Sequence, residues 1–438
     1  MDYRWPVGSR IGMRLRHDSA TAALVVDGSP TDQSHVQFDG AGERALTTLL
    51  RQSCARAPGE VESVAWELSE LLVPPEHAER VAALRIVPRP PVSDALREHP
   101  SPMLRTLVGQ RATVRGGHDL FGMELAPVDL DAAARAARAA ADAGFAALAV
   151  TAAGSAGSPD HERAVAERVL DAVPWLRLCL SHEVGGLGLL QREAATVLTA
   201  ALQPRATDLV GRCERITAAG VRRGVAWFAS GDGGRVSAER LRSFPVTGLE
   251  AGNAVGLLGA AMVSSTATAS VVLAAGDRFA AGQVRDGLPH AASDVMELGG
   301  MRLATPQAVL SPVSAPAVGE PTIVAAVNET DAAAARRFRA GLGSAATLVD
   351  PGTDVVAVGC TATEPTAWLD LVVSADTPAE LRRVRTMMED RTCTLLASGG
   401  ARPGTERVVS SAVVPLSFLR SGSYRVVIRA SGRLGGQA

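Results

Sequence analysis

Short apolar segments alternate with helix-length segments through much of this chain, and that alternation most narrows its possible folds. The clearest stretch begins with an Ala-rich segment that Asp129 or Asp131 can cap at its start and Gly144 can end. In chain order it predicts helix 130–144, strand 146–150, helix 158–170 and strand 176–180. Strands that alternate with helices of about 10–15 residues indicate an α/β protein whose sheet faces are both covered.

Two other stretches predict a strand, a tight turn and a second strand. The first has strands at 10–15 and 21–26 and ends in Asp27-Gly28. The second has a strand at 268–273, continues through Val284 and ends in Asp286-Gly287. The similarity between the two stretches suggests a duplicated architecture.

The composition excludes several classes of partner and chemistry. The net charge of −2 and the aromatic content of 3% argue against a nucleic-acid surface and against an anionic membrane. All 44 basic residues are arginines, and guanidinium groups stay protonated in proteins. Schiff-base chemistry and a phosphate-binding lysine are therefore excluded.

The cysteine pattern and the N-terminus favour a cytoplasmic protein. The five cysteines are widely spaced and include no CxxC pair, so we expect reduced thiols, with neither a zinc site nor a disulfide framework. The N-terminus lacks the apolar stretch of a signal peptide. The uncharged run 254–276 is long enough to span a bilayer, but its serines and threonines favour a buried helix followed by a buried strand.

At 438 residues the chain is too long for a single typical core. The stretch 303–321 carries four prolines and a single charged residue, which is Glu320. This composition is typical of a linker. We expect an N-terminal lobe at 1–204, a second lobe at 205–302, the Pro-rich linker at 303–321 and a C-terminal α+β unit at 322–438. A helix at 189–202 should end near Pro204, and a strand is expected at 355–358.

Three polar motifs lie close together in the central part of the chain. They are Pro159-Asp160-His161-Glu162, Ser181-His182-Glu183-Val184-Gly185, and the segment 188–196 that contains Arg192 and Glu193. Together they resemble the hydantoinase A/5-oxoprolinase family, in which a Pro-x-His-Glu helix start, a Ser-His-Glu-Ile/Val-Gly strand end and a Gly-Leu-Leu-Glu-Arg-Glu-Asn-Ala-Thr helix follow one another. A Gly-Gly-His turn at 116–118 and the segment 230–261 extend the resemblance, which departs from the family at Gln191, at Ala194 or Ala195, and at Thr199.

The resemblance implies an α/β fold of the actin-like, or ribonuclease H-like, type with two duplicated lobes and a small C-terminal α+β unit. Active members of the family bind ATP and Mg²⁺ between the lobes and open a cyclic amide ring, usually with a hydantoinase B-like partner subunit. His182, Glu183, Arg192 and Glu193 are the family-motif positions that the resemblance marks as site candidates.

The two phosphate-binding hairpins depart most from the family pattern Asp-x-Gly-Gly-Thr-x-Thr-Asp. In the first hairpin Arg14 stands at the metal-side Asp position, and Arg16 and His17 replace the two glycines. In the second hairpin Gly276 remains, and the replaced positions are Leu273, Asp277, Arg278, Phe279 and Ala280. A unit charge pair 4 Å apart is worth about 4 kcal/mol at an effective dielectric of 20, so arginine beside Mg²⁺ turns that attraction into repulsion. We expect Mg-ATP binding to be lost, with no other cofactor and no metal site.

Two groups of residues leave alternatives open. Arg14, Arg16 and His17, beside Asp18, could cradle a small anion, because arginine offers a bidentate fork, or they could form a solvated surface loop. Asp232 and Gly233 lie in a Gly-Asp-Gly-Gly turn and could either bind a ligand at the lobe interface or favour the turn itself.

Two functions follow from these residues. The first is a non-catalytic or regulatory homologue, a pseudoenzyme, that binds a partner subunit, a second copy of itself or a small anion. The second is an active hydrolase that opens a cyclic amide C–N bond in an altered cleft, with Arg14, His17, Asp18, Asp232 and Asp277 recruited. The sequence identifies no catalytic residue.

Overall fold

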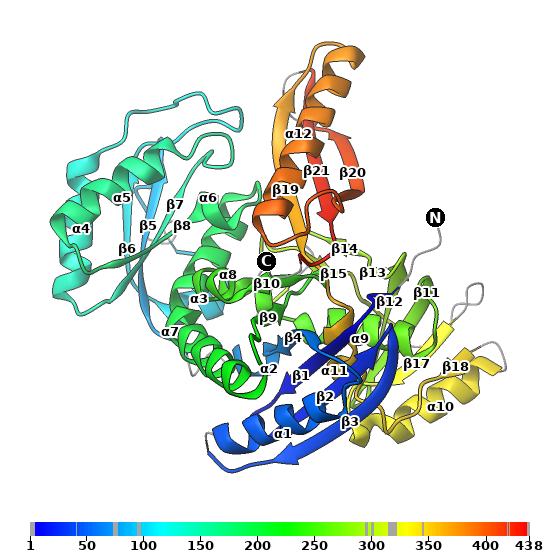
Figure 1. Ribbon diagram of the computed structural model, residues 1–438. Helices are drawn as coiled ribbons and strands as arrows, with labels where there is room; N and C mark the ends of the chain where they lie inside the picture. The colour runs from blue at the N-terminus through cyan, green and yellow to red at the C-terminus, as the bar shows by residue number, and fades with distance from the viewer. Residues whose placement is uncertain are drawn as a thin grey trace.

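The computed structural model describes residues 5–40, 42–72, 78–93, 98–293, 297–298, 302–313, 322–343, 346–417, 419 and 421–435. These residues form two lobes built on mixed sheets, an α/β unit inserted in the first lobe, and a C-terminal unit (Figure 1). In Figure 1 the inserted unit, in cyan, and the C-terminal unit, in orange and red, project from the two lobes on different sides.

The first lobe contains a six-stranded sheet. Its strands are β1 (Ser9–Leu15), β2 (Ser19–Val26), β3 (Ser29–Gln37), β4 (Val61–Glu67), β9 (Ala226–Ala229) and β10 (Arg235–Ser237). Their order is β10-β9-β4-β1-β2-β3, with β1, β2 and β3 antiparallel and β4 and β9 added in parallel beyond β1. All seven residues of β1 are buried, so this strand lies at the centre of the lobe.

The helices of the first lobe are α1 (Glu43–Arg56), α2 (Ser69–Leu72), α7 (Leu189–Gly220), α8 (Ala238–Ser243) and the 3₁₀ helix η3 (Pro245–Gly248). The predicted helix end near Pro204 is wrong, because α7 continues through this proline. A proline removes only one backbone hydrogen bond, and the buried residues on both sides of Pro204 hold the helix in the core. The expected boundary between residues 204 and 205 therefore falls inside one helix and needs correction.

An inserted unit separates β4 from α7. It contains the strands β5 (Val81–Val87), β6 (Val108–Arg115), β7 (Ala147–Ala152) and β8 (Arg177–Leu180), with helices α3 (Pro102–Leu107), α4 (Leu130–Asp142), α5 (Asp160–Ala172) and α6 (Ser181–Val184). The strands are all parallel in the order β6-β5-β7-β8, as the alternating pattern predicts. Asp129 caps α4, since its side chain accepts a hydrogen bond from the Ala132 amide at 2.8 Å.

The second lobe repeats the plan of the first. Its strands are β11 (Ala269–Ala275), β12 (Arg278–Arg285), β13 (Leu288–Pro289), β16 (Ser311–Pro312), β17 (Thr322–Ala326) and β18 (Ala346–Leu348). β11 pairs antiparallel with β12 and parallel with β17, as β1 does with β2 and β4. The predicted duplication of the strand-turn-strand unit is confirmed. β14 (Ala291–Ala292) and β15 (Gln307–Ala308) form a separate small pair.

Two apolar helices, α9 (Ala251–Val263) and α11 (Val355–Ala362), join the lobes through a shared core. The backbones approach so closely that a Cβ on Gly259 would lie 1.8 Å from the Val355 carbonyl oxygen, and one on Gly359 would lie 1.7 Å from that of Val255. The stretch 245–263 is apolar and long enough to cross a bilayer by composition alone, but 72% of its most apolar window is buried inside the fold.

The predicted strand at 355–358 is wrong, because these residues begin α11. Asp354 caps this helix by accepting hydrogen bonds from the Val356 and Ala357 amides at 3.1 and 3.0 Å. Every residue of α11 is buried, so its continuous apolar run resembles that of a buried strand and has no visible helical period.

The C-terminal unit has a three-stranded antiparallel sheet in the order β19-β21-β20, with one long helix packed on it. Its elements are β19 (Thr366–Ser374), α12 (Pro378–Ser398), β20 (Arg407–Pro415) and β21 (Ser423–Ser431). The expected unit 322–438 needs correction, because β17, η4 (Glu329–Asp331), α10 (Ala332–Leu342), β18 and α11 belong to the second lobe. Residues 314–321 of the expected linker lie outside the described residues.

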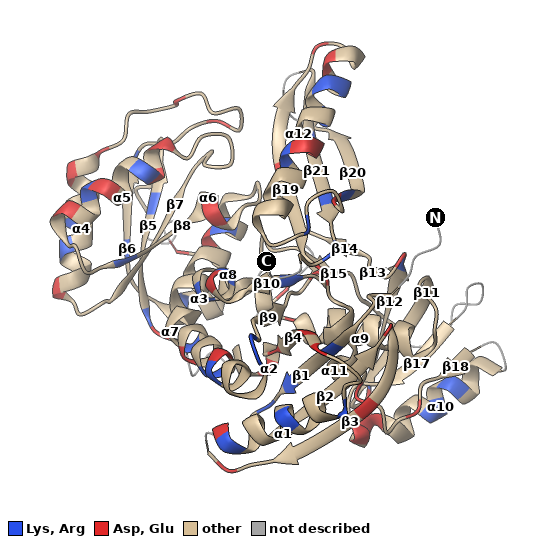
Figure 2. Cartoon of the chain, viewed as in Figure 1, with Lys and Arg blue, Asp and Glu red and all other residues tan. Residues whose placement is uncertain are grey.

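Charged residues are spread over all of these units. Figure 2 shows basic and acidic positions interspersed along the helices of the lobes, the inserted unit and the C-terminal unit. This distribution fits the small net charge of the chain.

Candidate functional site

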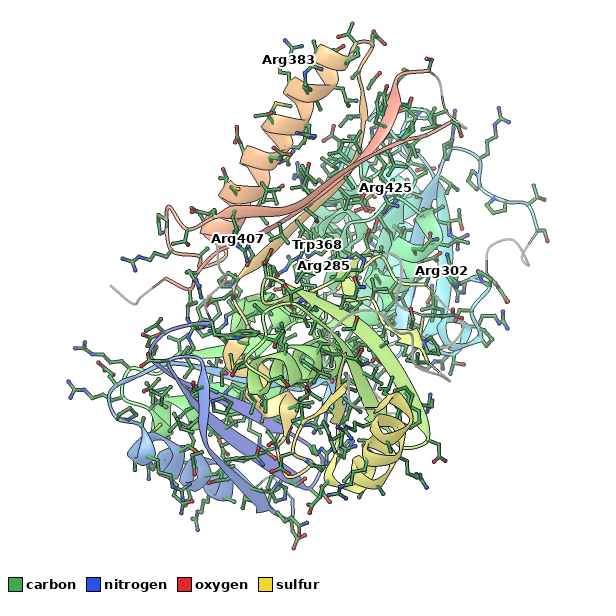
Figure 3. The ribbon with its side chains drawn as sticks, turned by 90° about the vertical axis from the view of Figure 1, so that its right-hand side faces the viewer. Arg285, Arg302, Trp368, Arg383, Arg407 and Arg425 are labelled. Carbon is green, nitrogen blue, oxygen red and sulfur yellow. The ribbon has the colours of Figure 1, made fainter. Side chains whose placement is uncertain are left out.

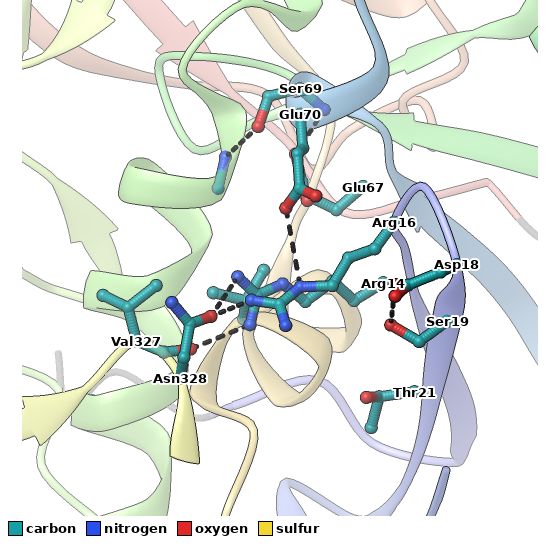
Figure 4. Close-up of polar contacts among 12 residues, drawn as sticks. Arg14, Arg16, Asp18, Ser19, Thr21, Glu67, Ser69, Glu70, Val327 and Asn328 are labelled. Carbon is teal, nitrogen blue, oxygen red and sulfur yellow. Dashed lines mark hydrogen bonds and ion pairs between the residues drawn. The ribbon is translucent and has the colours of Figure 1, made fainter. Parts of the chain in front are cut away.

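Arg14, near the end of β1, reaches from the first lobe to the second. Its side chain is buried, and Nη1 donates a 2.8 Å hydrogen bond to the Val327 carbonyl oxygen and lies 3.3 Å from Asp354 Oδ1. Nη2 donates to Asn328 Oδ1 at 3.1 Å (Figure 4). Because Val327 and Asn328 follow β17 and Asp354 begins α11, one guanidinium group binds two elements of the opposite lobe.

Arg16, just beyond β1, strengthens the same connection from a more exposed position. Its Nη2 also donates to Asn328 Oδ1, and its Nε lies 3.5 Å from Glu70 Oε2. The Arg16 and Glu70 side chains are 29% and 44% exposed. The two arginines that could have cradled an anion therefore do come together, but their hydrogen bonds go to groups of this chain (Figure 4).

The other candidates on the first hairpin do not join this cluster. His17 and Asp18 are exposed at the turn, and the Asp18 carboxylate accepts a 3.1 Å hydrogen bond from the adjacent Ser19 hydroxyl. Within the described part of the chain, neither side chain forms a hydrogen bond to the second lobe. The predicted cradle is thus limited to Arg14 and Arg16.

The second hairpin reaches the same region through its backbone. The Gly276 amide donates a 2.9 Å hydrogen bond to Asp331 Oδ1, and the Asn328 amide donates to Asp331 Oδ2 at 3.1 Å. The turn 327–331 therefore lies between the two hairpins and binds both. Asp277 and Arg278 are exposed at the hairpin tip and contribute no recorded hydrogen bond to this cluster.

Glu67, at the end of β4, is a buried carboxyl group beside Arg14 that the sequence did not single out. Its Oε1 accepts a 2.6 Å hydrogen bond from the Ser69 amide, and its side chain is 2% exposed. Burial raises the pKa of this carboxyl group, and the Ser69 hydrogen bonds and the charge of Arg14 offset only part of that effect. The group therefore favours its neutral form more than an ordinary glutamate does.

The polar groups at this contact between the lobes are bound to one another. Magnesium sites in proteins rely on carboxylates and substrate phosphates, and phosphate-binding loops rely on free backbone amides. Here Arg14 is paired with Asp354, which also caps α11, and Asp331 is bound to the Gly276 and Asn328 amides. Among the described residues, no group of three or more His, Cys, Asp or Glu side chains is arranged to hold a metal ion.

Asp232 joins the first lobe to the C-terminal unit, and both of its carboxylate oxygens accept hydrogen bonds within the chain. Its Oδ1 accepts from the Ser230 hydroxyl at 2.6 Å and the Gly234 amide at 3.1 Å, and its Oδ2 accepts from Trp368 Nε1 at 2.8 Å. Arg429 of β21 lies 3.6 Å from Oδ2 and donates to the Asp232 carbonyl oxygen. Of the two alternatives for this turn, the structure favours the turn itself, which here anchors the C-terminal unit.

The joint also explains Gly233 and the electrostatics of Asp232. Gly233 has a φ of +81°, and a Cβ there would lie 2.3 Å from the Pro289 ring. Burial alone would raise the pKa of Asp232, but Arg429 and the surrounding hydrogen bonds outweigh burial and lower it. Figure 3 shows Trp368 and Arg407 at the base of the C-terminal unit near Arg285 of the second lobe.

The family-motif residues gather at the carboxyl end of the inserted sheet, around a carboxylate that the sequence reasoning did not select. Glu162 is fully buried and accepts hydrogen bonds from the Ala152 amide (2.7 Å), Ser181 Oγ (2.6 Å), and the amide (2.9 Å) and Nδ1 (2.7 Å) of His182. Arg192 donates to Ser181 Oγ and to the carbonyl oxygens of Ala152, Gly186 and Leu187. Glu162 is the last residue of the Pro-Asp-His-Glu motif, so that motif could have identified it from the sequence.

The remaining motif positions differ in their surroundings. Glu193 is buried and pairs with Arg85 of β5 at 2.5 Å, so it joins α7 to the inserted sheet. Glu183 is exposed. His161 packs on His118 of the Gly-Gly-His turn, with ring centroids 4.1 Å apart, and its Nε2 lies 3.1 Å from Glu124. These contacts assign the motifs mainly to holding the inserted unit on the first lobe.

Comparisons with known proteins agree with this architecture. Residues 91–173, most of the inserted unit, match the family model of the hydantoinase/oxoprolinase N-terminal region. A comparison with curated protein sequences finds no match.

Two solved structures share the fold over nearly the whole chain. An ATP-dependent caprolactamase from Pseudomonas jessenii has a TM-score of 0.74 at 12% identity and covers 96% of this chain and 87% of its own. A nucleotide-free structure of acetone carboxylase, from work on ATP-dependent acetone carboxylation, has a TM-score of 0.66 at 12% identity. The match covers 99% of this chain and 88% of the acetone carboxylase chain. The chain therefore contains a segment that matches the hydantoinase/oxoprolinase N-terminal region, and it shares the fold of these two solved structures.

Proposed function

We propose that this chain is a non-catalytic or regulatory member of the hydantoinase/oxoprolinase family. It would act by binding a partner and would not turn over Mg-ATP. The observation that carries the proposal is the bridge from Arg14 to Val327, Asn328 and Asp354. In a nucleotide-dependent member, a cation-bound triphosphate would have to lie between the lobes. Here a guanidinium group already supplies the positive charge at that place and is bound by the opposite lobe.

The electrostatics support this interpretation. A Mg²⁺ ion beside Arg14 would repel it, and displacing Arg14 would leave Asp354 without its cationic partner. The backbone amide of Gly276, the one glycine kept in the second hairpin, already donates to Asp331. Nucleotide binding would therefore have to break contacts on both sides of the cleft.

Calorimetry with Mg-ATP tests the proposal directly. The wild-type chain should give no Mg²⁺-dependent heat of binding at micromolar to millimolar nucleotide. Arg51→Ala serves as a control for non-specific charge effects, because Arg51 is exposed and its guanidinium group donates to the Ala219 carbonyl oxygen, away from Arg14. Micromolar, Mg²⁺-dependent affinity in the wild type would refute the proposal.

The partner side of the proposal needs a separate experiment. A hydantoinase B-like subunit from the same genome is the first candidate, and self-association is the second. Co-expression followed by size-exclusion chromatography with light scattering should give a complex of defined stoichiometry. If the chain stays monomeric alone and with that subunit, a role through either partner is excluded.

A second function, opening of a cyclic amide ring, is favoured by one observation. Glu67 is a buried carboxyl group beside Arg14 whose pKa is raised by burial, and a carboxyl group that keeps its proton more readily than usual can act as a general acid. Incubation with ATP, Mg²⁺ and hydantoin, 5-oxoproline or caprolactam should then release a ring-opened acid, and Glu67→Gln should abolish the release. If mass spectrometry detects no product above the buffer rate, this alternative fails.

A further inference from the structure

A second arginine cluster, away from the cleft, has the opposite property to Arg14: its strongest donors lack partners. Arg235, the first residue of β10, is 1% exposed. Its Nε donates to Thr363 Oγ1 at 3.1 Å, and its backbone amide donates to the Glu364 carbonyl oxygen at 3.0 Å. Nη1 and Nη2 are both buried and have no hydrogen-bond partner within the described residues.

The one buried carboxylate nearby is already used by other groups. Glu364 is 5% exposed, and its Oε1 lies 2.9 Å from Arg10 Nη1 and 3.7 Å from Arg433 Nη1. Its Oε2 accepts a 2.7 Å hydrogen bond from the Leu434 amide. Neither oxygen forms a hydrogen bond with the two terminal nitrogens of Arg235.

The cluster carries more positive than negative charge. Arg10 is 6% exposed and lies close enough to Arg235 to affect its protonation, and its Nε is 3.6 Å from Glu62, whose side chain is 49% exposed. Burial first, and the charge of Arg10 second, lower the pKa of Arg235 to about 9, so it remains charged at neutral pH. Cys360 does not compensate this charge, because burial raises the pKa of its thiol and keeps it neutral.

A buried cation without a hydrogen-bond partner is costly in proteins. The cost is removed when a counter-charge accepts hydrogen bonds from the free nitrogens. Water could accept the bonds but would leave the charge uncompensated. The free donors come from one guanidinium group, which suits a small monovalent ion better than a divalent oxyanion with several oxygen atoms to satisfy.

We propose that Arg235, together with Arg10, forms a buried binding site for a small monovalent anion of the halide type. The ion would lie where β10, the end of α11 and the segment 433–434 meet, so binding would stabilise the attachment of the C-terminal unit to the first lobe. This site is separate from the Arg14 cleft and does not depend on whether the chain binds nucleotide.

Bromide is the direct probe, because it replaces chloride and gives an anomalous signal in diffraction. Crystals of the full chain soaked in sodium bromide should show an anomalous peak within hydrogen-bond distance of Arg235 Nη1 or Nη2. A map with bromide peaks only elsewhere on the molecule would overturn the proposal. This experiment needs no variant, so it does not depend on whether a substitution at Arg235 folds.

Thermal unfolding at constant ionic strength gives a second test. When sodium chloride replaces sodium gluconate, whose anion is too large for the site, the wild-type Tm should rise in a saturable way by roughly 2 °C or more. Arg235→Met should lose the response and, in gluconate, be at least as stable as the wild type, because it removes the uncompensated charge. Arg242→Met, which removes a partly exposed arginine paired with Glu214, should keep the response. A chloride response that survives in Arg235→Met would place the ion elsewhere and refute the site.

Discussion

At two interfaces of the first lobe, the cleft at Arg14 and the joint at Asp232, the sequence left a ligand site and a plain structural role open. Each interface is held by an ion pair within the chain. In the cleft, Arg14 and Asp354 have side chains that are 9% and 14% exposed. At the joint, Arg429 and Asp232 are 3% and 5% exposed, and every oxygen of the Asp232 carboxylate is bound. The cleft pair lies nearer to solvent and continues into the half-exposed pair of Arg16 and Glu70.

This difference separates a permanent attachment from a contact that can open. A fully enclosed ion pair is sensitive to the loss of either partner, because the remaining charge has no access to water. A pair near solvent loses less, since water can replace the missing partner. We therefore expect the joint to behave as part of the fold and the cleft to be the place where the two lobes can move.

The largest effect should follow from breaking the joint. Asp232→Ala leaves Arg429 buried without its carboxylate and removes the acceptor of Trp368 Nε1, so the free energy of unfolding should fall by about 3–5 kcal/mol. Asp370→Ala is the matched control, because it removes the Arg425 ion pair from the same unit at 10% and 25% exposure. Urea unfolding followed by tryptophan fluorescence measures both. Equal losses in the two variants would contradict the distinction.

Breaking the cleft bridge should cost less. Arg14→Ala leaves Asp354 with the two amides at the start of α11, which still stabilise its charge, so we expect a loss of about 2–3 kcal/mol. Hydrogen exchange should also increase in the turn 327–331, because Asn328 loses a donor from the first lobe. A double-mutant cycle with Asp354→Asn isolates the pair, since asparagine keeps the helix cap. A coupling energy near zero would show that the pair does not hold the lobes.

Much of the architecture could be predicted from the sequence because it is encoded locally. The alternation of strands and helices predicted the α/β layering seen in the inserted unit, and the two strand-turn-strand patterns predicted the duplicated hairpins. The predicted strand at 355–358 failed where local encoding is weakest. A short helix buried on all sides has the same continuous apolar run as a buried strand, and only the cap at Asp354 distinguishes them.

The candidate site was harder to predict because its partners are distant in sequence. The hairpin motif identified Arg14 and Arg16, but Asn328 and Asp354 are separated from Arg14 by 314 and 340 residues. No local pattern indicates such a pairing. Asp232 illustrates the reverse problem, since a turn with an aspartate fits a ligand site or a structural joint equally well until Trp368 and Arg429 are placed beside it.

The two interfaces should also respond to pH in opposite directions. The pKa of Asp232 is lowered in the folded chain, so its contribution to stability is present above its unfolded value near 3.8 and is lost as the pH falls through the folded value. The pKa of Glu67 is raised, so its contribution is present below its unfolded value near 4.5 and is lost as the pH rises through the folded value. The joint should therefore weaken as the pH falls into the acid range. The cleft should weaken as the pH rises above the unfolded value of Glu67.

Differences in Tm between variants and wild type across this pH range test the assignment. Asp232→Asn should be destabilised most at neutral pH, with the gap to wild type closing in acid. Glu67→Gln should show the opposite trend, with its stability relative to wild type improving as the pH rises above about 4.5. Parallel pH profiles for the two variants would contradict the opposite shifts.

The smallest effect should come from Arg16, at the solvent side of the cleft. Exposed ion pairs contribute about 0–1 kcal/mol, and the Arg16–Glu70 pair is 29% and 44% exposed, so Arg16→Ala should lower the free energy of unfolding by no more than that. The loss should shrink further at high salt, whereas the loss in Arg14→Ala should change little, because screening acts mainly on exposed charges. If Arg16→Ala proved as costly as Arg14→Ala at every salt concentration, the cleft would be as tightly enclosed as the joint, and the expectation that the lobes open there would fail.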